Sequence, residues 1–224
     1  MHLSGNQKCD FSMALQNRVT AFGDIVAHRA RGQMMGNRGG RIHENDRTLG
    51  QRRWASDAWI ICVLEFKQRH RRIMAANSYT ELFFLDEVTA LCAGHRPCFE
   101  CRRKAANDFA EKWGASTGLD NRARAGDMDK CLHLERVKTQ KSGNYPRQDL
   151  SNLPDGTMIL WQGQPTAIKD NLLLPWTIEG YGKPVVRPLG FDVEVLTPLC
   201  TVEVLNAGYQ PLFHRRKHGP NRQQ

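Results

Sequence analysis

The stretch LDEVTALCAGHRPCFECRRKAANDFAEKW, residues 85–113, carries the clearest structural signals in the chain. Asp86 precedes a run of good helix formers that stops at Gly94, which predicts a short helix between these two residues. After the HRPC turn, the spacing of the apolar side chains predicts a second helix over 99–113. Two helices joined by a turn with a Cys-x-x-Cys pair are therefore expected in the middle of the fold.

Strand signals flank this helical middle on both sides. Upstream, apolar pieces separated by glycines at 17–43 predict short strands, and the apolar runs in 54–67 and 73–84 predict a hairpin with a basic turn. Downstream, a third helix is predicted over 126–138, with an Asp near its start as the cap. From residue 153, alternating apolar strands and Asp-Gly or Gln-Gly turns predict a β-meander.

The expected fold class is α+β, with short N-terminal strands, a helical middle that carries the Cys-x-x-Cys knuckle, and a β-rich C-terminal meander. The expected parts are a flexible N-terminus at 1–16, an α+β module at 17–141, a β-rich unit at 153–214 and a basic tail at 215–224. The softest boundary is 142–152. Residues 198–211 fit either a short helix closed by Gly208 or a further strand.

The composition of the 224 residues, 40% of them hydrophobic, is sufficient for one large domain or two small ones with a core. No apolar run approaches the ~20 residues needed to span a bilayer. The polar start MHLSGNQKCDFSM lacks the apolar centre of a secretory signal. Seven cysteines, an odd number, favour free thiols with a metal site over a disulfide framework. We expect a cytoplasmic protein without membrane association.

The formal net charge of +9 creates a positive field that attracts polyanions. Many soluble proteins are also basic without binding nucleic acid, so the charge alone leaves both interpretations open. Arginines grouped around the glycine-rich GNRGG stretch and in the RHRR block favour nucleic acid, DNA more than RNA, as the partner. The expected phosphate contacts are Arg38, Arg41, Arg69, Arg71 and Arg72.

The pair Cys98-x-x-Cys101 lies at a tight turn into a helix, which places both sulfurs on one side. The helix N-terminus and the neighbouring arginines favour the thiolate form. Three interpretations compete. A redox pair needs a preceding strand in a βαβ context, whereas a helix is predicted here. The pair can also be two inert thiols at a helix start, or two ligands of a Zn²⁺ ion, which we favour.

The other ligands of such a zinc site are harder to identify. Zinc needs four ligands, and the chain has no second Cys-x-x-Cys pair. Four other cysteines are expected on core faces, where small buried thiols are ordinary: Cys62, Cys92, Cys131 and Cys200. Histidines are the remaining candidates, in the order His43, His133 and His95.

The segment YTELFFLDEVTALCAGHRPCFECRR, residues 79–103, resembles the second half of the zinc-binding domain of Ada-type DNA alkylation-repair proteins. In that family a FxxxxEAxxAGxRPCxxCxP pattern carries the last two zinc cysteines. The resemblance rests on Phe83 or Phe84, Asp86, Glu87, Ala90, Gly94, Arg96, Pro97, Cys98 and Cys101. It implies a small sheet with helices around one Zn²⁺ in the 17–141 module, and contact with DNA.

The first cysteine pair of that family is absent here. The corresponding segment KQRHRRIMAANSYTE, residues 67–81, contains no cysteine. The acceptor thiol of the family's methyl-transfer reaction is one of those cysteines, so we do not expect alkyl transfer. The resemblance implies a structural metal knuckle on a module that faces nucleic acid.

Two other groups of residues have the chemistry of acid/base or metal-hydrolytic sites. His43 and Glu44 form one together with Asp46. Asp127, Asp129 and Glu135 beside His133 form the other. Ordinary loop and helix-surface roles explain both groups equally well. Three functions remain open: a zinc-containing nucleic-acid-binding protein in DNA processing or repair, a hydrolytic enzyme acting on nucleic acid or nucleotide through His43 and Glu44, and a metal-stabilised protein-interaction module.

Overall fold

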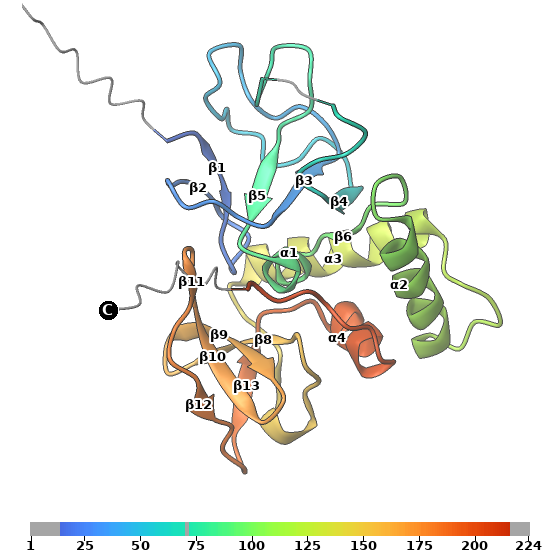
Figure 1. Cartoon of the computed structure of the whole chain (residues 1–224). Coiled ribbons are helices and arrows are strands. Elements are labelled where there is room, and N and C mark those ends of the chain that lie inside the picture. Colours follow the sequence, from blue (N-terminus) through green and yellow to red (C-terminus); the bar gives the residue numbers. More distant parts are fainter. Residues whose placement is uncertain (1–13, 70–71, 216–224) are drawn as a thin grey trace, which may run out of the picture.

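The computed structural model describes residues 14–69 and 72–215, which form two β-sheets with helices between and beside them (Figure 1). This arrangement confirms the expected α+β class. Residues 1–13, 70–71 and 216–224 lie outside the described residues, and with them the predicted phosphate contact Arg71 and most of the expected flexible N-terminus and basic tail. Among the described helices, none combines the length and the apolar character needed to cross a bilayer.

The first sheet has the strand order β2-β1-β5-β3-β4-β6. Its strands are β1 (Gln16–Val19), β2 (Ile25–Ala27), β3 (Met34–Arg38), β4 (Trp59–Cys62), β5 (Leu82–Phe84) and β6 (Arg96–Pro97). The predicted hairpin of 54–67 with 73–84 is wrong, because β3 lies between β4 and β5 and pairs antiparallel with both. Gly36 permits this insertion, since a Cβ there would lie 2.2 Å from the Ile60 carbonyl oxygen.

The predicted helices are all present, with shifted boundaries. The first, α1 (Glu87–Cys92), has Asp86 as its N-cap, whose carboxylate accepts a hydrogen bond from the Thr89 backbone at 2.9 Å. Gly94 follows it with φ +76°, as the stop signal predicted. The second, α2 (Arg103–Ser116), starts four residues later than predicted, because the chain between β6 and α2 forms a turn.

The third helix, α3 (Ala125–Ser142), is longer than predicted and begins after Arg124, so Asp127 lies in its first turn and is not its cap. The segment that fitted either a helix or a strand forms the helix α4 (Leu199–Asn206). It packs against α2 and α3, which brings the C-terminal end of the chain back to the helical middle.

The second sheet confirms the predicted meander, since β8 to β11 pair antiparallel in sequence order. The full order is β11-β10-β9-β8-β13-β7, with β12 also paired to β10. The elements are β7 (Arg147–Asp149), a 3-10 helix (Leu150–Asn152), β8 (Met158–Trp161), β9 (Gln164–Lys169), β10 (Leu172–Thr177), β11 (Gly180–Tyr181), β12 (Val185–Val186) and β13 (Asp192–Val195).

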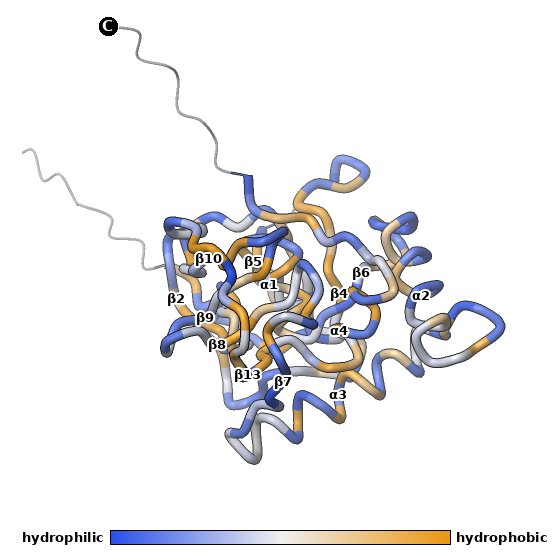
Figure 2. Tube along the Cα trace, turned by 90° about the horizontal axis from the view of Figure 1, so that it is seen from below, coloured by the Kyte–Doolittle hydropathy of each residue, from blue (hydrophilic) through white to orange (hydrophobic). Residues whose placement is uncertain are grey.

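The two sheets share buried apolar side chains across α1. Val88 of α1 belongs to one cluster with Met158 and Trp176 of the second sheet, and the Trp176 indole donates a 3.0 Å hydrogen bond to the Thr89 hydroxyl. In Figure 2 the apolar stretches gather around β5, β8, β10 and β13 in the interior. Burial of this surface is the main favourable term that holds the two halves together.

The acidic residues at the start of α1 attach the C-terminal segment to the helical middle. The Glu87 carboxylate accepts two hydrogen bonds from the Arg102 guanidinium, at 2.8 and 2.7 Å, and one from the Tyr209 hydroxyl at 2.6 Å. Asp86 accepts hydrogen bonds from the Tyr181 hydroxyl and from the His214 backbone, at 2.7 and 2.8 Å. Neighbouring acidic side chains thus fix three distant parts of the chain.

We expect Glu87→Gln to lower the free energy of unfolding by about 3–5 kcal/mol, because the Arg102 guanidinium stays buried without its counter-charge. The side chains of the pair are only 1% and 7% exposed. Urea denaturation followed by circular dichroism measures the loss. The matched control is Asp108→Asn, which breaks the more exposed pair with Lys112 and should cost less than about 1 kcal/mol. Equal costs for the two variants would contradict the role of Glu87.

Candidate metal centre

Three cysteines from distant parts of the sequence meet beside the first sheet. Cys62 is the last residue of β4, Cys98 follows β6, and Cys101 lies in the turn before α2. Their sulfur atoms all lie within 4.8 Å of one another. Cys62 and Cys98 are buried, whereas Cys101 is partly exposed. The structure therefore brings together the two cysteines that the sequence predicted and adds a third.

Strand pairing positions this cluster. β4 and β6 are parallel neighbours with Ile61 opposite Pro97, so the next residues along each strand, Cys62 and Cys98, are also side by side. The Cys98 backbone N–H donates to the Ile61 carbonyl at 3.0 Å. The sequence predicted Cys62 to be an ordinary core thiol, because periodicity indicates a buried strand but not its neighbour. Its position at the end of the apolar run, directly before a polar loop, was the available signal.

The cluster has the chemistry of a metal site. Hydrogen bonds from the thiols of Cys101 and Cys62 lower the pKa of Cys98, whereas contacts with the other two sulfurs raise the pKa of Cys62. Sulfur ligands of one tetrahedral Zn²⁺, at ~2.3 Å from the ion, are about 3.8 Å apart. Sulfurs within 4.8 Å of one another need only small movements to reach that geometry. The three cysteines could therefore hold a metal ion.

The histidines predicted as ligands lie elsewhere. His43 is buried, and its ring nitrogens contact the Thr80 hydroxyl at 2.6 Å and the Ala75 carbonyl at 3.2 Å. His133, on α3, lies 3.6 Å from the Asp57 carboxylate. Neither belongs to the cysteine group formed by the described residues. The neighbouring Glu44 is exposed, so the predicted catalytic pair consists of a ring held inside the protein and a carboxylate at its surface.

The third histidine of the sequence ranking, His95, is a core residue. It is fully buried, and its ring centroid lies 5.0 Å from that of Trp59 and 4.7 Å from that of Phe84. Burial, together with the positive charges of Arg38 and Arg136, lowers the pKa of His95 well below its ordinary value. The ring is therefore neutral at physiological pH.

The predicted phosphate contacts divide into inner and outer arginines. Arg38 is 1% exposed, stacks on Trp59 at 4.0 Å and donates to the Gly23 carbonyl, while burial lowers its pKa to about 9. Arg41 is half-buried and holds its own loop by donating to the His43 carbonyl. Arg69 and Arg72 are exposed. Among the predicted phosphate contacts that the structure describes, Arg69 and Arg72 are therefore the most open to a partner.

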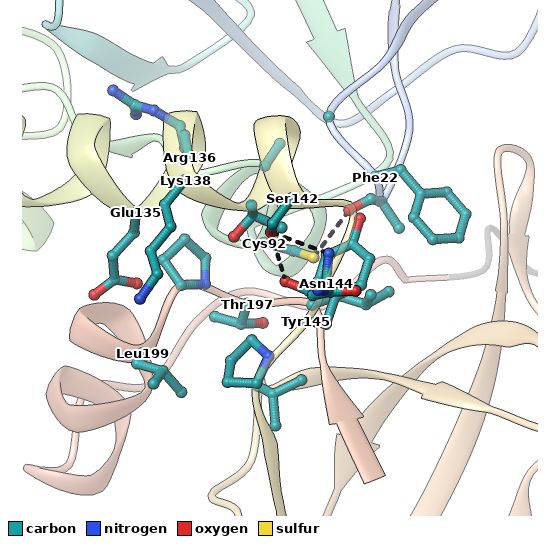
Figure 3. A pocket seen from close by; sticks show the side chains of 18 of the residues that line it. Phe22, Cys92, Glu135, Arg136, Lys138, Ser142, Asn144, Tyr145, Thr197 and Leu199 are labelled. Carbon is teal, nitrogen blue, oxygen red and sulfur yellow. Dashed lines mark hydrogen bonds between the residues drawn. The ribbon is translucent and has the colours of Figure 1, made fainter.

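A pocket of about 510 Å³ lies between α3 and the start of α4. Figure 3 shows Lys138, Ser142, Asn144, Tyr145 and Thr197 around it. Glu135, one of the acidic residues beside His133, lines this pocket, whereas none of the described residues predicted as zinc ligands or phosphate contacts does. The sequence therefore indicated one of its side chains but not the pocket itself.

No family model, no curated protein and no solved structure matches this chain. The Ada-type resemblance of residues 79–103 therefore stays a prediction from the sequence. The evidence for the site is the geometry of its three sulfurs.

We expect Cys62→Ser to remove one equivalent of bound metal, as Cys98→Ser does, because both substitutions replace one of three converging thiolates. Elemental analysis of protein purified under reducing conditions measures the loss. Cys92→Ser is the matched control, since Cys92 is also buried but donates to the Ala21 carbonyl, away from the cluster. Unchanged metal content in Cys62→Ser would show that Cys62 is no ligand.

The neutral state of His95 predicts a pH dependence of stability. The unfolded chain binds a proton at this residue below pH ~6.5, and the folded chain does not. The contribution of the neutral His95 ring to the free energy of unfolding is therefore complete above pH ~6.5. It falls as the pH drops below this value, by up to about 1.4 kcal/mol per pH unit. Urea denaturation at several pH values gives the free energy of unfolding as a function of pH. Below pH ~6.5, the slope of this dependence should be smaller in His95→Phe than in the wild type by that amount. A slope parallel to that of the wild type would contradict a neutral buried ring.

Proposed function

We propose that this chain is a zinc-stabilised nucleic-acid-binding protein. Cys62, Cys98 and Cys101 supply three of the four ligands that Zn²⁺ takes, and their thiolates favour it over harder cations. The bound ion acts as a structural cross-link between β4, β6 and the start of α2. The resemblance of residues 79–103 to a family that contacts DNA favours DNA over RNA.

The observation that carries this proposal is the ion pair of Arg69 with Glu100, at 3.0 Å. It joins the loop that follows Cys62 to the turn between Cys98 and Cys101. Exposed cationic side chains stand on this loop and on the first turn of α2, just after Cys101, so an ion held by the cysteines orders them together. We call these cations the knuckle surface, which consists of Lys67, Arg69, Arg72, Arg103 and Lys104.

The knuckle surface also contains an aromatic ring. Phe66 is half-exposed, with the Lys67 ammonium 5.1 Å and the Arg69 guanidinium 5.4 Å from its ring centroid. An aromatic face among cations can stack on a base while the cations neutralise the phosphates beside it. This combination supports a nucleic-acid partner over a generally basic surface without one.

The alternative of a metal-stabilised interaction module is favoured by a different region. Four apolar side chains are exposed around β12 and β13, in the second sheet: Val185, Val186, Leu189 and Phe191. Exposed apolar patches of this kind mark protein contacts. This surface is separate from the knuckle surface, so both functions can reside in one chain. The hydrolytic alternative lacks such support, since the ring nitrogens of His43 are engaged within the protein.

We expect binding to a fluorescent DNA duplex to weaken as salt rises. Arg69→Ala and Lys104→Ala should each reduce the salt slope by about 0.9, the value of one lost phosphate contact, and weaken binding to all sequences alike. Fluorescence anisotropy across a salt series measures both quantities. Lys183→Ala is the matched control, because it removes a cation that is also exposed but lies between β11 and β12.

Metal removal, measured in the same assay, provides a second test of the proposed function. A chelator under reducing conditions should lower the DNA affinity of the wild type, because the two cationic segments lose their common anchor. Absence of affinity at low salt, or affinity that salt does not change, would refute the nucleic-acid function. The protein-interaction function would then be the remaining one.

A further inference from the structure

A second group of metal-ligating side chains lies at the contact of α3 with α4. Cys131 and Glu135 stand on α3, and Cys200 is the second residue of α4. The two sulfur atoms and a carboxylate oxygen lie within 4.8 Å of one another. We propose that Cys131, Glu135 and Cys200 form a second Zn²⁺ site, which clamps α4 to α3.

The arrangement follows from the helices themselves. Cys131 and Glu135 are four residues apart, so their side chains share one face of α3. The Cys200 backbone N–H donates to the Glu135 carboxylate at 3.1 Å, which fixes this carboxylate at the start of α4. An ionised carboxylate has about four lone-pair positions, so this bond leaves room for a cation. The three ligand atoms are thus held from both helices before any ion binds.

The charge of the group calls for a cation. Among the side chains that the structure describes, no Lys or Arg forms an ion pair with Glu135. Lys138, on the next turn, extends to the same side of α3 as Glu135 without pairing with it (Figure 3). Packing of two small thiols at the edge of the core explains the cysteines, and the Cys200 N–H engages only one of the two carboxylate oxygens. A divalent ion satisfies all three groups at once.

The donor set selects the class of ion. Two thiolates with one carboxylate suit Zn²⁺, whereas Mg²⁺ and Ca²⁺ prefer oxygen ligands alone. Three protein ligands leave one coordination position for water or another molecule. Glu135 and Leu199, the residue before Cys200, both line the 510 Å³ pocket, so the site stands at the rim of that pocket. By contrast, none of Cys62, Cys98 and Cys101 lines this pocket.

Metal titration of the full-length, reduced, metal-free chain tests the proposal, with Zn²⁺ alone as the probe. The wild type should bind two equivalents, and Cys131→Ser/Cys200→Ser should bind one. Glu135→Gln keeps the size of the side chain and should weaken the second equivalent by at least about tenfold, since even outer-shell changes cost that much. Glu203→Gln, an exposed change on the same helix α4, should bind as the wild type does.

A second double variant distinguishes binding at the two sites. Cys62→Ser/Cys98→Ser should lose the knuckle equivalent and keep the one at Cys131, so the second site can hold even if the nucleic-acid function fails. Circular dichroism of each variant confirms its fold. The proposal is overturned if the wild type binds a single equivalent that depends on Cys62, if Glu135→Gln binds Zn²⁺ as tightly as the wild type, or if mass spectrometry of the reduced chain finds Cys131 and Cys200 joined as a disulfide.

Discussion

The buried ion pair of Glu87 with Arg102 is the constraint on which the rest of the structure depends. Glu87 opens α1, and Arg102 stands at the start of α2, directly after Cys101. The same carboxylate receives the Tyr209 hydroxyl from the returning C-terminal segment. Attraction between two buried charges offsets the cost of removing them from water only when their geometry is good. The two-pronged contact and the extra hydrogen bond supply that geometry. This ion pair thereby fixes the helical middle, the cysteine turn and the C-terminal segment relative to one another.

The candidate metal centre depends on that frame through pairing between distant strands. β6 has only two residues, yet its parallel contact with β4 brings Cys98 to Cys62. Behind this contact, Arg136 and Arg38 stack on Trp59, at 3.7 and 4.0 Å from its ring. These two cations inside the protein therefore serve as structural supports for β4, whereas the cations around the cysteine cluster lie at the surface.

Local signals in the sequence predicted the local parts of the fold. The Asp86 cap, the Gly94 stop and the meander turns all act within a few residues, so the sequence shows them directly. The order of the strands depends on contacts between distant residues, which periodicity does not encode. For this reason the sequence identified Cys98 and Cys101 but assigned Cys62 to the core, and it ranked His43 as a ligand although Thr80 engages its ring.

The distance along the chain between β4 and β6 has a consequence for biosynthesis. Cys62 leaves the ribosome well before Cys98 and Cys101, because the loop after β4, the strand β5 and the helix α1 are synthesised in between. Until β6 pairs with β4, Cys62 of the nascent chain lacks the other two thiols of the cluster. Closure of this long loop is therefore the step that turns three separate thiols into one chelating group, and Cys62, the first of the three to be synthesised, waits longest for protection from oxidation.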